Sequence, residues 1–291
     1  MSRAPRPPTR PPAFFLTESS TPGPSLASAD ARHALRVLRL GVGDLLVGLD
    51  GRGRRFPLRV QRLGKDTLEL ESAGPPVRDP APGQEGSAIP WIEVAVSWPR
   101  RNRVEDMLGR LVQLGAAAIR PLMTQQRGPE EPPEHAPERW LRIAREACKQ
   151  SGRTWLPVFE PRLSPAELAS HHSKAAVAVL EPEAGFALDS WLRSLTPSPA
   201  GIGTQARPIV LVIGPEGGLT EEERSALLET GASPVWAAPH ILRVETAAEA
   251  AAAIAAVVHG RTVGPRVHEC SLQGSLILDR SDTKPSSPTI T

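Results

Sequence analysis

Hydrophobic and polar residues follow different patterns in the amino-terminal part (the front) and the carboxyl-terminal part (the back) of the chain. In the front, up to about residue 75, the apolar runs are short and are separated by turns that contain glycine. Runs of this kind, bounded by turn residues, are typical of β-strands, and their spacing predicts a small barrel or a compact sheet. The expected strands are DLLVGLD (44–50), RRFPLRVQRL (54–63) and TLELES (67–72).

One helix is expected before these strands, in the sequence ASADARHALRVLRLGVGD. Ala34, Val37, Leu38 and Leu40 recur there at helical spacing, and Gly41 stands at the natural end of such a helix.

The back of the chain changes to short apolar runs that alternate with longer amphipathic segments. Runs of about five apolar residues are typical of buried strands, and helical periodicity is clearest over residues 103–115 and 138–150. Alternating strands and helices predict an α/β fold, in which helices cover both faces of a parallel sheet. The expected strands are residues 92–98, 116–123, 175–180, 209–213 and 234–238.

Three stretches have the composition of a tether. They are a Pro- and Arg-rich leader (1–12), a Pro- and Gly-rich linker (76–88, within a stretch that begins at Ser72) and a Ser-, Thr- and Pro-rich tail (264–291). These boundaries predict two domains, at residues 13–75 and 89–263.

Composition narrows the class of protein. The chain has 291 residues, 40% of them apolar, and no run approaches the roughly 18 apolar residues of a membrane helix. The first residues lack the apolar core of a signal peptide, so export is not expected. Cys148 and Cys270 are too few for a disulfide framework or a thiolate zinc site, which favours a cytoplasmic protein. We expect no metal, and we interpret His171 and His172 as a polar helix end.

Charge is spread unevenly. The whole chain carries +2, but residues 1–75 hold twelve Lys and Arg against seven Asp and Glu. A basic front domain indicates an anionic partner such as RNA, and solubilising surface arginines explain it equally well. The expected first helix carries four of the basic groups, as phosphate contacts or as its solvated face: Arg32, His33, Arg36 and Arg39.

The sequence IVLVIGPEGGLTEEERSALL (209–228) carries the strongest chemical signal. IVLVI is a buried strand, and GPEGGL forms the turn at its carboxyl end, where open α/β sheets hold their ligands. Thr220 and Glu223 have the spacing of a capping box, so a helix is expected to follow.

The acids around this turn argue against a phosphate ligand. Phosphate sites leave a helix N-terminus free for the anion, whereas Glu216, Glu221, Glu222 and Glu223 surround this one, and neither phosphate-loop fingerprint is present. S-adenosylmethionine fits better, because it has a cationic sulfonium and no phosphate. An ordinary tight turn is the alternative at this point.

A second motif, APHILRVETAAEAAAAIAAVV, follows the last apolar run and predicts a helix opened by Thr246, with Glu249 three residues later. IGPEGGLTEEE together with ILRVETA closely resembles the RsmE family of 16S ribosomal RNA (uracil-N3)-methyltransferases of the SPOUT superfamily. HALRVLRLGVGD, DGRGRRF, LVQLGAAAIRPL and REACKQSGR match further family segments in order, so the resemblance spans nearly the whole chain.

The resemblance implies properties that spacing does not show. They are an amino-terminal PUA-like RNA-binding β-barrel and a SPOUT-type α/β domain with a deep carboxyl-terminal trefoil knot, which general topological rules would not predict. The resemblance also implies a homodimer and S-adenosylmethionine as cofactor. The implied reaction is methylation of uracil N3 in 16S ribosomal RNA or the small ribosomal subunit. Neither a membrane nor a metal is expected to take part.

Matching positions imply the site residues. The expected cofactor-binding residues are Leu180, Ile213, Gly214, Pro215, Glu216, Gly217, Gly218, Ala238, Ile241, Leu242, Arg243 and Thr246. Arg243 is the expected group that favours the uracil anion, and Glu245 the one that orients it or relays a proton. In the alternative, Arg243 and Glu245 only pair with one another. RNA contacts, or plain surface roles, are expected at Arg32, His33, Arg36, Arg39, Arg100, Arg101, Arg103 and Arg153.

Four positions depart from the family pattern. Val244 stands where Thr is usual, Ala238 where Gly is usual, Gln113 where Glu is usual and Ala13 where Arg is common. The departures leave two interpretations besides uracil-N3 methylation: a SPOUT enzyme for another RNA position, and a non-catalytic RNA-binding or assembly factor. An oxidoreductase is disfavoured, because the dinucleotide fingerprint is missing.

Overall fold

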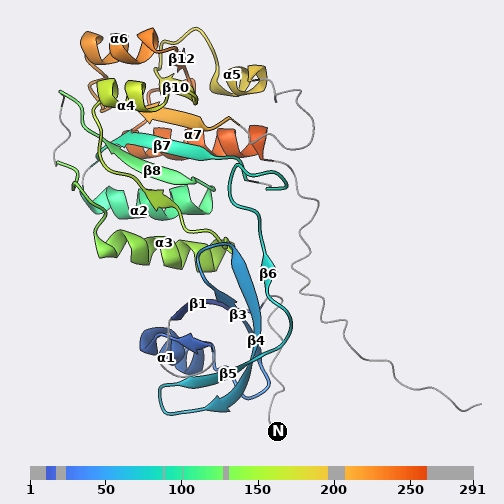
Figure 1. The fold of residues 1–291 in the computed structure, drawn as a ribbon. Helices are drawn as coiled ribbons and strands as arrows, with labels where there is room; N and C mark the ends of the chain where they lie inside the picture. Colours follow the sequence, from blue (N-terminus) through green and yellow to red (C-terminus); the bar gives the residue numbers. More distant parts are fainter. Residues whose placement is uncertain are drawn as a thin grey trace, which may run out of the picture.

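The chain folds into a small β-barrel followed by an α/β domain (Figure 1). The structure is a computed structural model, and it describes residues 11–17, 24–87, 89–99, 101–126, 131–195 and 207–260, without the side chains of residues 101 and 102. The predicted tail (264–291) and most of the leader lie outside these ranges. The predicted small barrel and the predicted α/β domain are both present.

The front sheet has strand order β2-β1-β3-β4-β5, with β6 paired to β4, and it curls until β2 contacts β5. Its interior is filled by the inward side chains of alternating positions, among them Phe14, Leu46, Leu58 and Val60. The strands are β1 (Ala13–Thr17), β2 (Ser25–Leu26), β3 (Leu45–Leu49), β4 (Arg54–Leu63), β5 (Leu68–Ser72) and β6 (Val77–Arg78). Residues 77 and 78 were predicted to be linker, but they form a strand.

Helix α1 (Ser28–Arg36) is shorter than predicted. It closes the barrel with Ala31 and Ala34, whereas Val37 and Leu38 are 64% and 41% exposed. The apolar spacing at Val37 and Leu38 therefore did not mark a buried helical face. The chain leaves the helix before Arg39, whose φ of 56° is in the left-handed region.

The α/β domain has a six-stranded sheet of order β12-β10-β11-β7-β8-β9, and every pair in it is parallel. Strand β11 lies inside the sheet and is buried along its whole length, which explains its uninterrupted apolar sequence. The strands are β7 (Ile92–Ser97), β8 (Ala118–Leu122), β9 (Val158–Phe159), β10 (Ala176–Leu180), β11 (Ile209–Ile213) and β12 (Ser233–Val235).

Helices cover both faces of this sheet, as predicted. Val94 and Leu211 point to one face, which packs against α2, α3, α5 and α7. Ala95 and Val210 point to the other face, toward α4 and α6. The helices are α2 (Arg101–Gln113), α3 (Glu138–Ser151), α4 (Pro165–His171), α5 (Leu188–Ser194), α6 (Glu221–Glu229) and α7 (Val244–His259).

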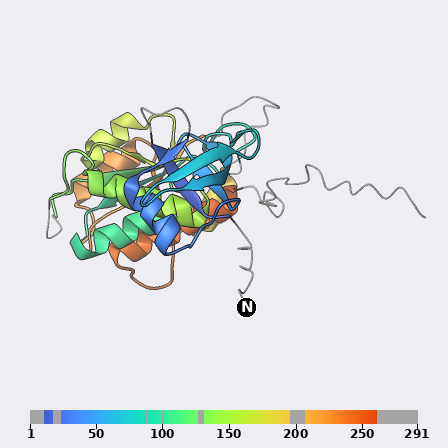
Figure 2. The same ribbon diagram turned by 90° about the horizontal axis from the view of Figure 1, so that it is seen from below.

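The barrel lies against helix α3 of the α/β domain (Figure 1), so that in the view from below it stands in front of that domain (Figure 2). Lys149 of α3 donates to Asp30 of α1 across 2.9 Å, and the hydroxyl of Thr154 donates to the Asp79 carboxylate across 2.8 Å. Phe15 of β1 belongs to the same apolar core as α3. These contacts fix the barrel against the α/β domain.

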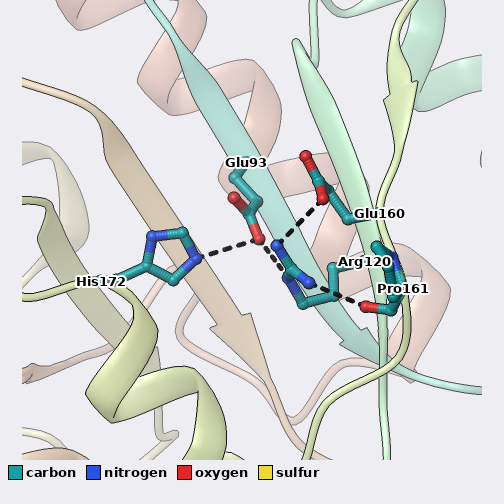
Figure 3. A network of polar contacts seen from close by, with 5 residues as sticks. All are labelled: Glu93, Arg120, Glu160, Pro161 and His172. Atoms are coloured by element: carbon teal, nitrogen blue, oxygen red, sulfur yellow. Dashed lines mark hydrogen bonds and ion pairs between the residues drawn. The ribbon is translucent and has the colours of Figure 1, made fainter.

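A buried polar network joins β7, β8 and the end of α4 (Figure 3). The Arg120 guanidinium donates to Glu93 at 2.6 Å and to the Pro161 carbonyl at 2.8 Å, and it lies 3.4 Å from Glu160. The His172 ring lies 3.2 Å from the same Glu93 oxygen. Glu93 and Arg120 are almost fully buried, so each charge depends on the other for its solvation.

This network makes stability depend on acidity. Burial raises the pKa of the Glu93 carboxyl, but hydrogen bonds from His172 and Arg120 outweigh it and hold the pKa below its ordinary value. A carboxylate with a depressed pKa stabilises the fold above its unfolded pKa of about 4.3 and loses that contribution as pH falls through the folded pKa. We expect the free energy of unfolding to decrease as the pH is lowered through the acidic range, and to decrease less steeply in the Glu93→Gln variant than in the wild type. Denaturant titrations between about pH 3 and 6 measure both slopes, and equal slopes would contradict the assignment.

Candidate active site at the carboxyl edge of the sheet

Three loops that carry most of the predicted cofactor residues start side by side. In the parallel register, Leu180 of β10 lies between Ile213 of β11 and Val235 of β12. Since these three residues end their strands, the chain segments after them meet at one edge of the sheet. This is the edge at which open parallel sheets bind ligands.

The glycine loop turns tightly between β11 and α6. The Gly218 amide donates to the Pro215 carbonyl across 2.9 Å, and Gly218 has φ of 80°, which a side chain would strain. The predicted capping box is confirmed, because the Thr220 hydroxyl accepts from the Glu223 amide and the Glu223 carboxylate accepts from the Thr220 amide.

Side chains outside the turn GPEGGL hold the glycine loop in place. Arg224 of α6 donates two hydrogen bonds to Glu181, which follows β10, at 2.7 and 3.3 Å. A Cβ atom on Gly217 would lie 2.0 Å from the Gln126 side-chain oxygen, so the segment after β8 touches the loop. Sequence reasoning missed all three of these residues, because each is far along the chain from the residue that it contacts.

The third loop (236–243) joins β12 to α7 through a bridge residue, Trp236, and a series of bends at residues 237–240. Trp236 exchanges two backbone hydrogen bonds with the segment before α5, both of 2.9 Å. Within the described residues, no hydrogen bond uses the amide groups of Ala238, Ile241 or Leu242. Ile241 is 83% exposed. The loop therefore offers free backbone donors beside apolar surface.

Helix α7 begins three residues earlier than predicted, because its N-cap is Arg243 and not Thr246. Its first residue is Val244 and its N-cap position is Arg243, with no side-chain cap. Thr246 is therefore an exposed residue of the first turn and does not cap the helix, and Glu249 binds Arg110 of α2 at 3.1 Å. The capping-box prediction for Thr246 and Glu249 was wrong, because an interhelical ion pair takes the carboxylate.

Glu245 has a different partner from the one considered in the sequence. Arg103 of α2 donates to it across 2.9 Å, and its second carboxylate oxygen is buried without a hydrogen bond among the described residues. Arg243 is exposed, and the described part of the chain holds no ion pair to it. The two candidate catalytic groups do not pair with one another, which leaves the Arg243 guanidinium available.

The basic residues predicted to contact RNA lie in different settings. Arg32, His33, Arg36 and Arg39 are exposed on and after α1, and Arg36 pairs with Asp66 at 2.9 Å. Arg100 lies outside the described residues, and Arg101 is described only as the first residue of α2.

Arg153 is not on the surface. It is 8% exposed, and its guanidinium donates to the carbonyls of Trp155 at 2.6 Å and Val112 at 3.0 Å. The structure therefore gives Arg153 a role inside the protein, where it joins α2 to the loop after α3, and not the RNA contact that we expected.

The departures from the family pattern fall in unstrained places. Val244 is buried at the start of α7, where its methyl groups pack in the core. Gln113 exchanges a hydrogen bond with Gln150 at 3.3 Å, and Ala13 pairs with Val47 in the barrel. Ala238 is half-buried in the third loop. None of the four distorts the three loops.

These loops fit a ligand such as S-adenosylmethionine. A glycine turn, free backbone amides and the apolar Leu180, Ile241 and Leu242 suit an adenosine group, and the acidic residues around the turn suit a cation better than a phosphate. Residues 213–218 and 236–243 follow strands that the parallel register holds on either side of β10, so both loops start at the same edge of the sheet.

Comparison with known proteins gives the class and then the family. A model of the RNA methyltransferase domain matches residues 87–256, and a model of the RNA methyltransferase PUA domain matches residues 26–71. This chain therefore belongs to the class of RNA methyltransferases that have an amino-terminal PUA domain. The ribosomal RNA small subunit methyltransferase E of Synechocystis is 33% identical over 227 residues, which are 77% of this chain and 69% of that protein. The chain belongs to the ribosomal RNA small subunit methyltransferase E family.

Solved structures support the same fold. The family member from Neisseria gonorrhoeae, bound to S-adenosyl methionine, has a TM-score of 0.60 and 26% identity, and the match covers 84% of this chain and 96% of that one. A probable rRNA-methyltransferase from Porphyromonas gingivalis has a TM-score of 0.67 and 26% identity, with coverage of 85% and 98%.

Proposed function

We propose that this protein transfers the methyl group of S-adenosylmethionine to N3 of a uridine in 16S ribosomal RNA. The observation that carries the proposal is the meeting of three loops at Leu180, Ile213 and Val235, in a chain of this family. When bound, S-adenosylmethionine supplies an electrophilic methyl group on a sulfonium. The remaining requirement is to hold a uracil nitrogen in line with that methyl group.

The chain's own residues have distinct roles in this reaction. Uracil N3 must lose its proton, and a guanidinium beside the base favours the resulting anion. Arg243 is suited to that role, because it is exposed at the N-cap of α7 and adjoins the predicted cofactor wall. Glu245 is held by Arg103, and its unpaired oxygen makes it the candidate to accept a proton.

The RNA contacts and the assembly belong to the same proposal. Arg32, Arg36 and Arg39 are the available phosphate contacts of the barrel, and Arg103 lies beside the site. We further propose the trefoil knot, a homodimer, and a cytoplasmic location, where 16S ribosomal RNA or the small subunit is accessible. No described helix is long and apolar enough to span a membrane.

Calorimetric titration with S-adenosylmethionine tests the cofactor site. We expect Gly217→Trp to weaken binding at least about thirtyfold, which corresponds to about 2 kcal/mol, because an indole fills the space above the glycine loop. Gly217 is exposed and does not need a positive φ, and its closest neighbour is the end of the Gln126 side chain, so the variant is expected to fold.

Glu229→Trp, at the exposed far end of α6, is the matched control and is expected to bind like the wild type. If the folded Gly217→Trp protein binds with unchanged affinity, the cofactor is not held by this loop. If the folded wild type binds none, the non-catalytic RNA-binding function replaces the proposal.

A further inference from the structure

A pocket of about 630 Å³ lies beside the glycine loop and outside the predicted cofactor site. It opens over the carboxyl ends of β7 and β8, whereas the cofactor loops follow β10, β11 and β12. Ser97 and Trp98 line it from the end of β7, Thr124 and Gln125 from the segment after β8, and Glu222 from the first turn of α6. The next residue of the same segment, Gln126, touches Gly217. The pocket therefore adjoins the glycine loop through the segment 124–126, while its own lining comes from the residues around that loop.

The lining excludes a phosphate group as the occupant. Among the described residues that line the pocket, none is Lys or Arg, and three are Glu. A phosphate there would meet negative charge without a counter-ion. The polar side chains of the lining are three carboxylates, three hydroxyl groups, one amide and one indole N–H, so the pocket suits a neutral group that donates hydrogen bonds.

Two of the three carboxylates are already engaged. Glu223 accepts from the Gln125 amide at 2.6 Å and from the Thr220 amide at 2.9 Å, and Glu131 pairs with Arg162 at 2.7 Å. Glu222 is exposed and has no hydrogen-bond or ion-pair partner within the described ranges. It is the carboxylate of this pocket that is free to accept from a ligand.

The pocket lining near β7 and β8 combines hydroxyl groups with an aromatic residue. The Ser97 and Thr124 hydroxyl oxygens are buried and lie 3.5 Å apart, at the limit of a hydrogen bond, so the Ser97 hydroxyl retains donor and acceptor capacity. Trp98 is 6% exposed and is held by its contact with Trp140, with ring centroids 4.8 Å apart, so it offers the pocket a small and rigid apolar surface. A rigid aromatic residue, hydroxyl groups and a free carboxylate are the groups with which proteins hold an unstacked base.

We infer that this pocket binds one base of the substrate RNA other than the methylated uracil, and that the base carries an exocyclic amino group. The amino group donates to the Glu222 carboxylate while the base lies against the Trp98 side of the pocket. Uracil has no amino group, so the pocket discriminates against the very base that receives the methyl group. The inference rests on the proposed function, since it places a flanking nucleotide next to the reaction site. Base contacts of this kind give sequence selectivity, which phosphate contacts do not.

Free nucleosides test the pocket without any methyl transfer. Ligand-observed NMR titrations of the full-length protein would compare cytidine, which has the amino group, with uridine, which does not. We expect cytidine to bind at least fivefold more tightly than uridine, and Glu222→Ala to weaken cytidine about tenfold. Glu221→Ala, one residue away and outside the pocket, is the matched control and leaves cytidine binding unchanged. Equal binding of the two nucleosides, or unchanged cytidine binding by Glu222→Ala, would overturn the inference.

A second variant fills the pocket. Ala166 lines it from the exposed start of α4, so Ala166→Phe is expected to fold normally and to abolish cytidine binding. In methylation assays with saturating S-adenosylmethionine, Glu222→Ala is expected to raise the KM for small-subunit RNA. If the wild type transfers no methyl group, the proposed function fails, and the nucleoside titrations still decide whether the pocket binds a base. A folded Ala166→Phe protein that binds cytidine like the wild type would refute the assignment of the pocket.

Discussion

Arg243→Ala is expected to lower the rate of methyl transfer to small-subunit ribosomal RNA by about a hundred- to a thousandfold, or about 2.7 to 4 kcal/mol of transition-state stabilisation. The guanidinium acts on the negative charge that develops on the uracil as N3 loses its proton. Groups that are already near the developing charge stabilise it most effectively, and the N-cap position of α7 places the Arg243 backbone beside the cofactor loops. Single-turnover assays with saturating S-adenosylmethionine measure the chemical step directly.

The pH profile separates this role from simple RNA binding. If Arg243 favours the uracil anion, the Arg243→Ala enzyme regains part of its rate as pH rises toward the ionisation of uracil, and its affinity for S-adenosylmethionine changes little. Arg110→Ala is the control, because Arg110 also contacts α7 but pairs with Glu249, further along the helix. A folded Arg243→Ala enzyme with the wild-type rate at neutral pH would eliminate the catalytic role.

Arg120→Ala is expected to destabilise the protein by about 3 to 5 kcal/mol. The change leaves the Glu93 carboxylate 3% exposed and without its closest cation, and a buried charge without its partner is costly. Glu93 and Arg120 lie on neighbouring strands of the sheet that positions the site, so the loss affects the whole α/β domain. Urea unfolding followed by circular dichroism measures the change.

Two further variants make this prediction specific. Arg193→Ala removes an exposed arginine 3.8 Å from Asp189, and it is expected to change stability by less than about 1 kcal/mol. The double variant Glu93→Leu with Arg120→Met removes both charges together and is expected to recover much of the loss. A loss below about 1 kcal/mol for Arg120→Ala would show that the buried pair is not needed.

Local chemistry explains the elements that the sequence predicted well. The strand Ile209–Ile213 is apolar at every position because both of its faces are buried. The capping box of helix α6 is formed by Thr220 and Glu223, which are only three residues apart in the sequence. The alternation of strands and helices in the back of the chain also requires only local patterns. These features specified the α/β domain and placed the glycine loop at its carboxyl edge.

Long-range contacts explain what the sequence did not show. Arg103 and Glu245 are 142 residues apart, and Arg153 reaches the Val112 carbonyl from 41 residues away, so neither partner follows from spacing. Val37 and Leu38 have helical spacing, yet the chain turns at Arg39 and exposes both side chains. The pocket over β7 and β8 likewise depends on strand order, which periodicity does not define.

The most direct test of the central claim is methyl transfer from S-adenosylmethionine to small ribosomal subunits that lack the modification, followed by mass spectrometry of the RNA nucleosides. The account predicts one 3-methyluridine per 16S ribosomal RNA, formed by the wild type and strongly reduced with Arg243→Ala. A folded wild type that binds S-adenosylmethionine and methylates a ribose or another base would contradict the assignment of uracil N3. A protein that binds the RNA and transfers no methyl group to it would contradict the enzymatic function itself.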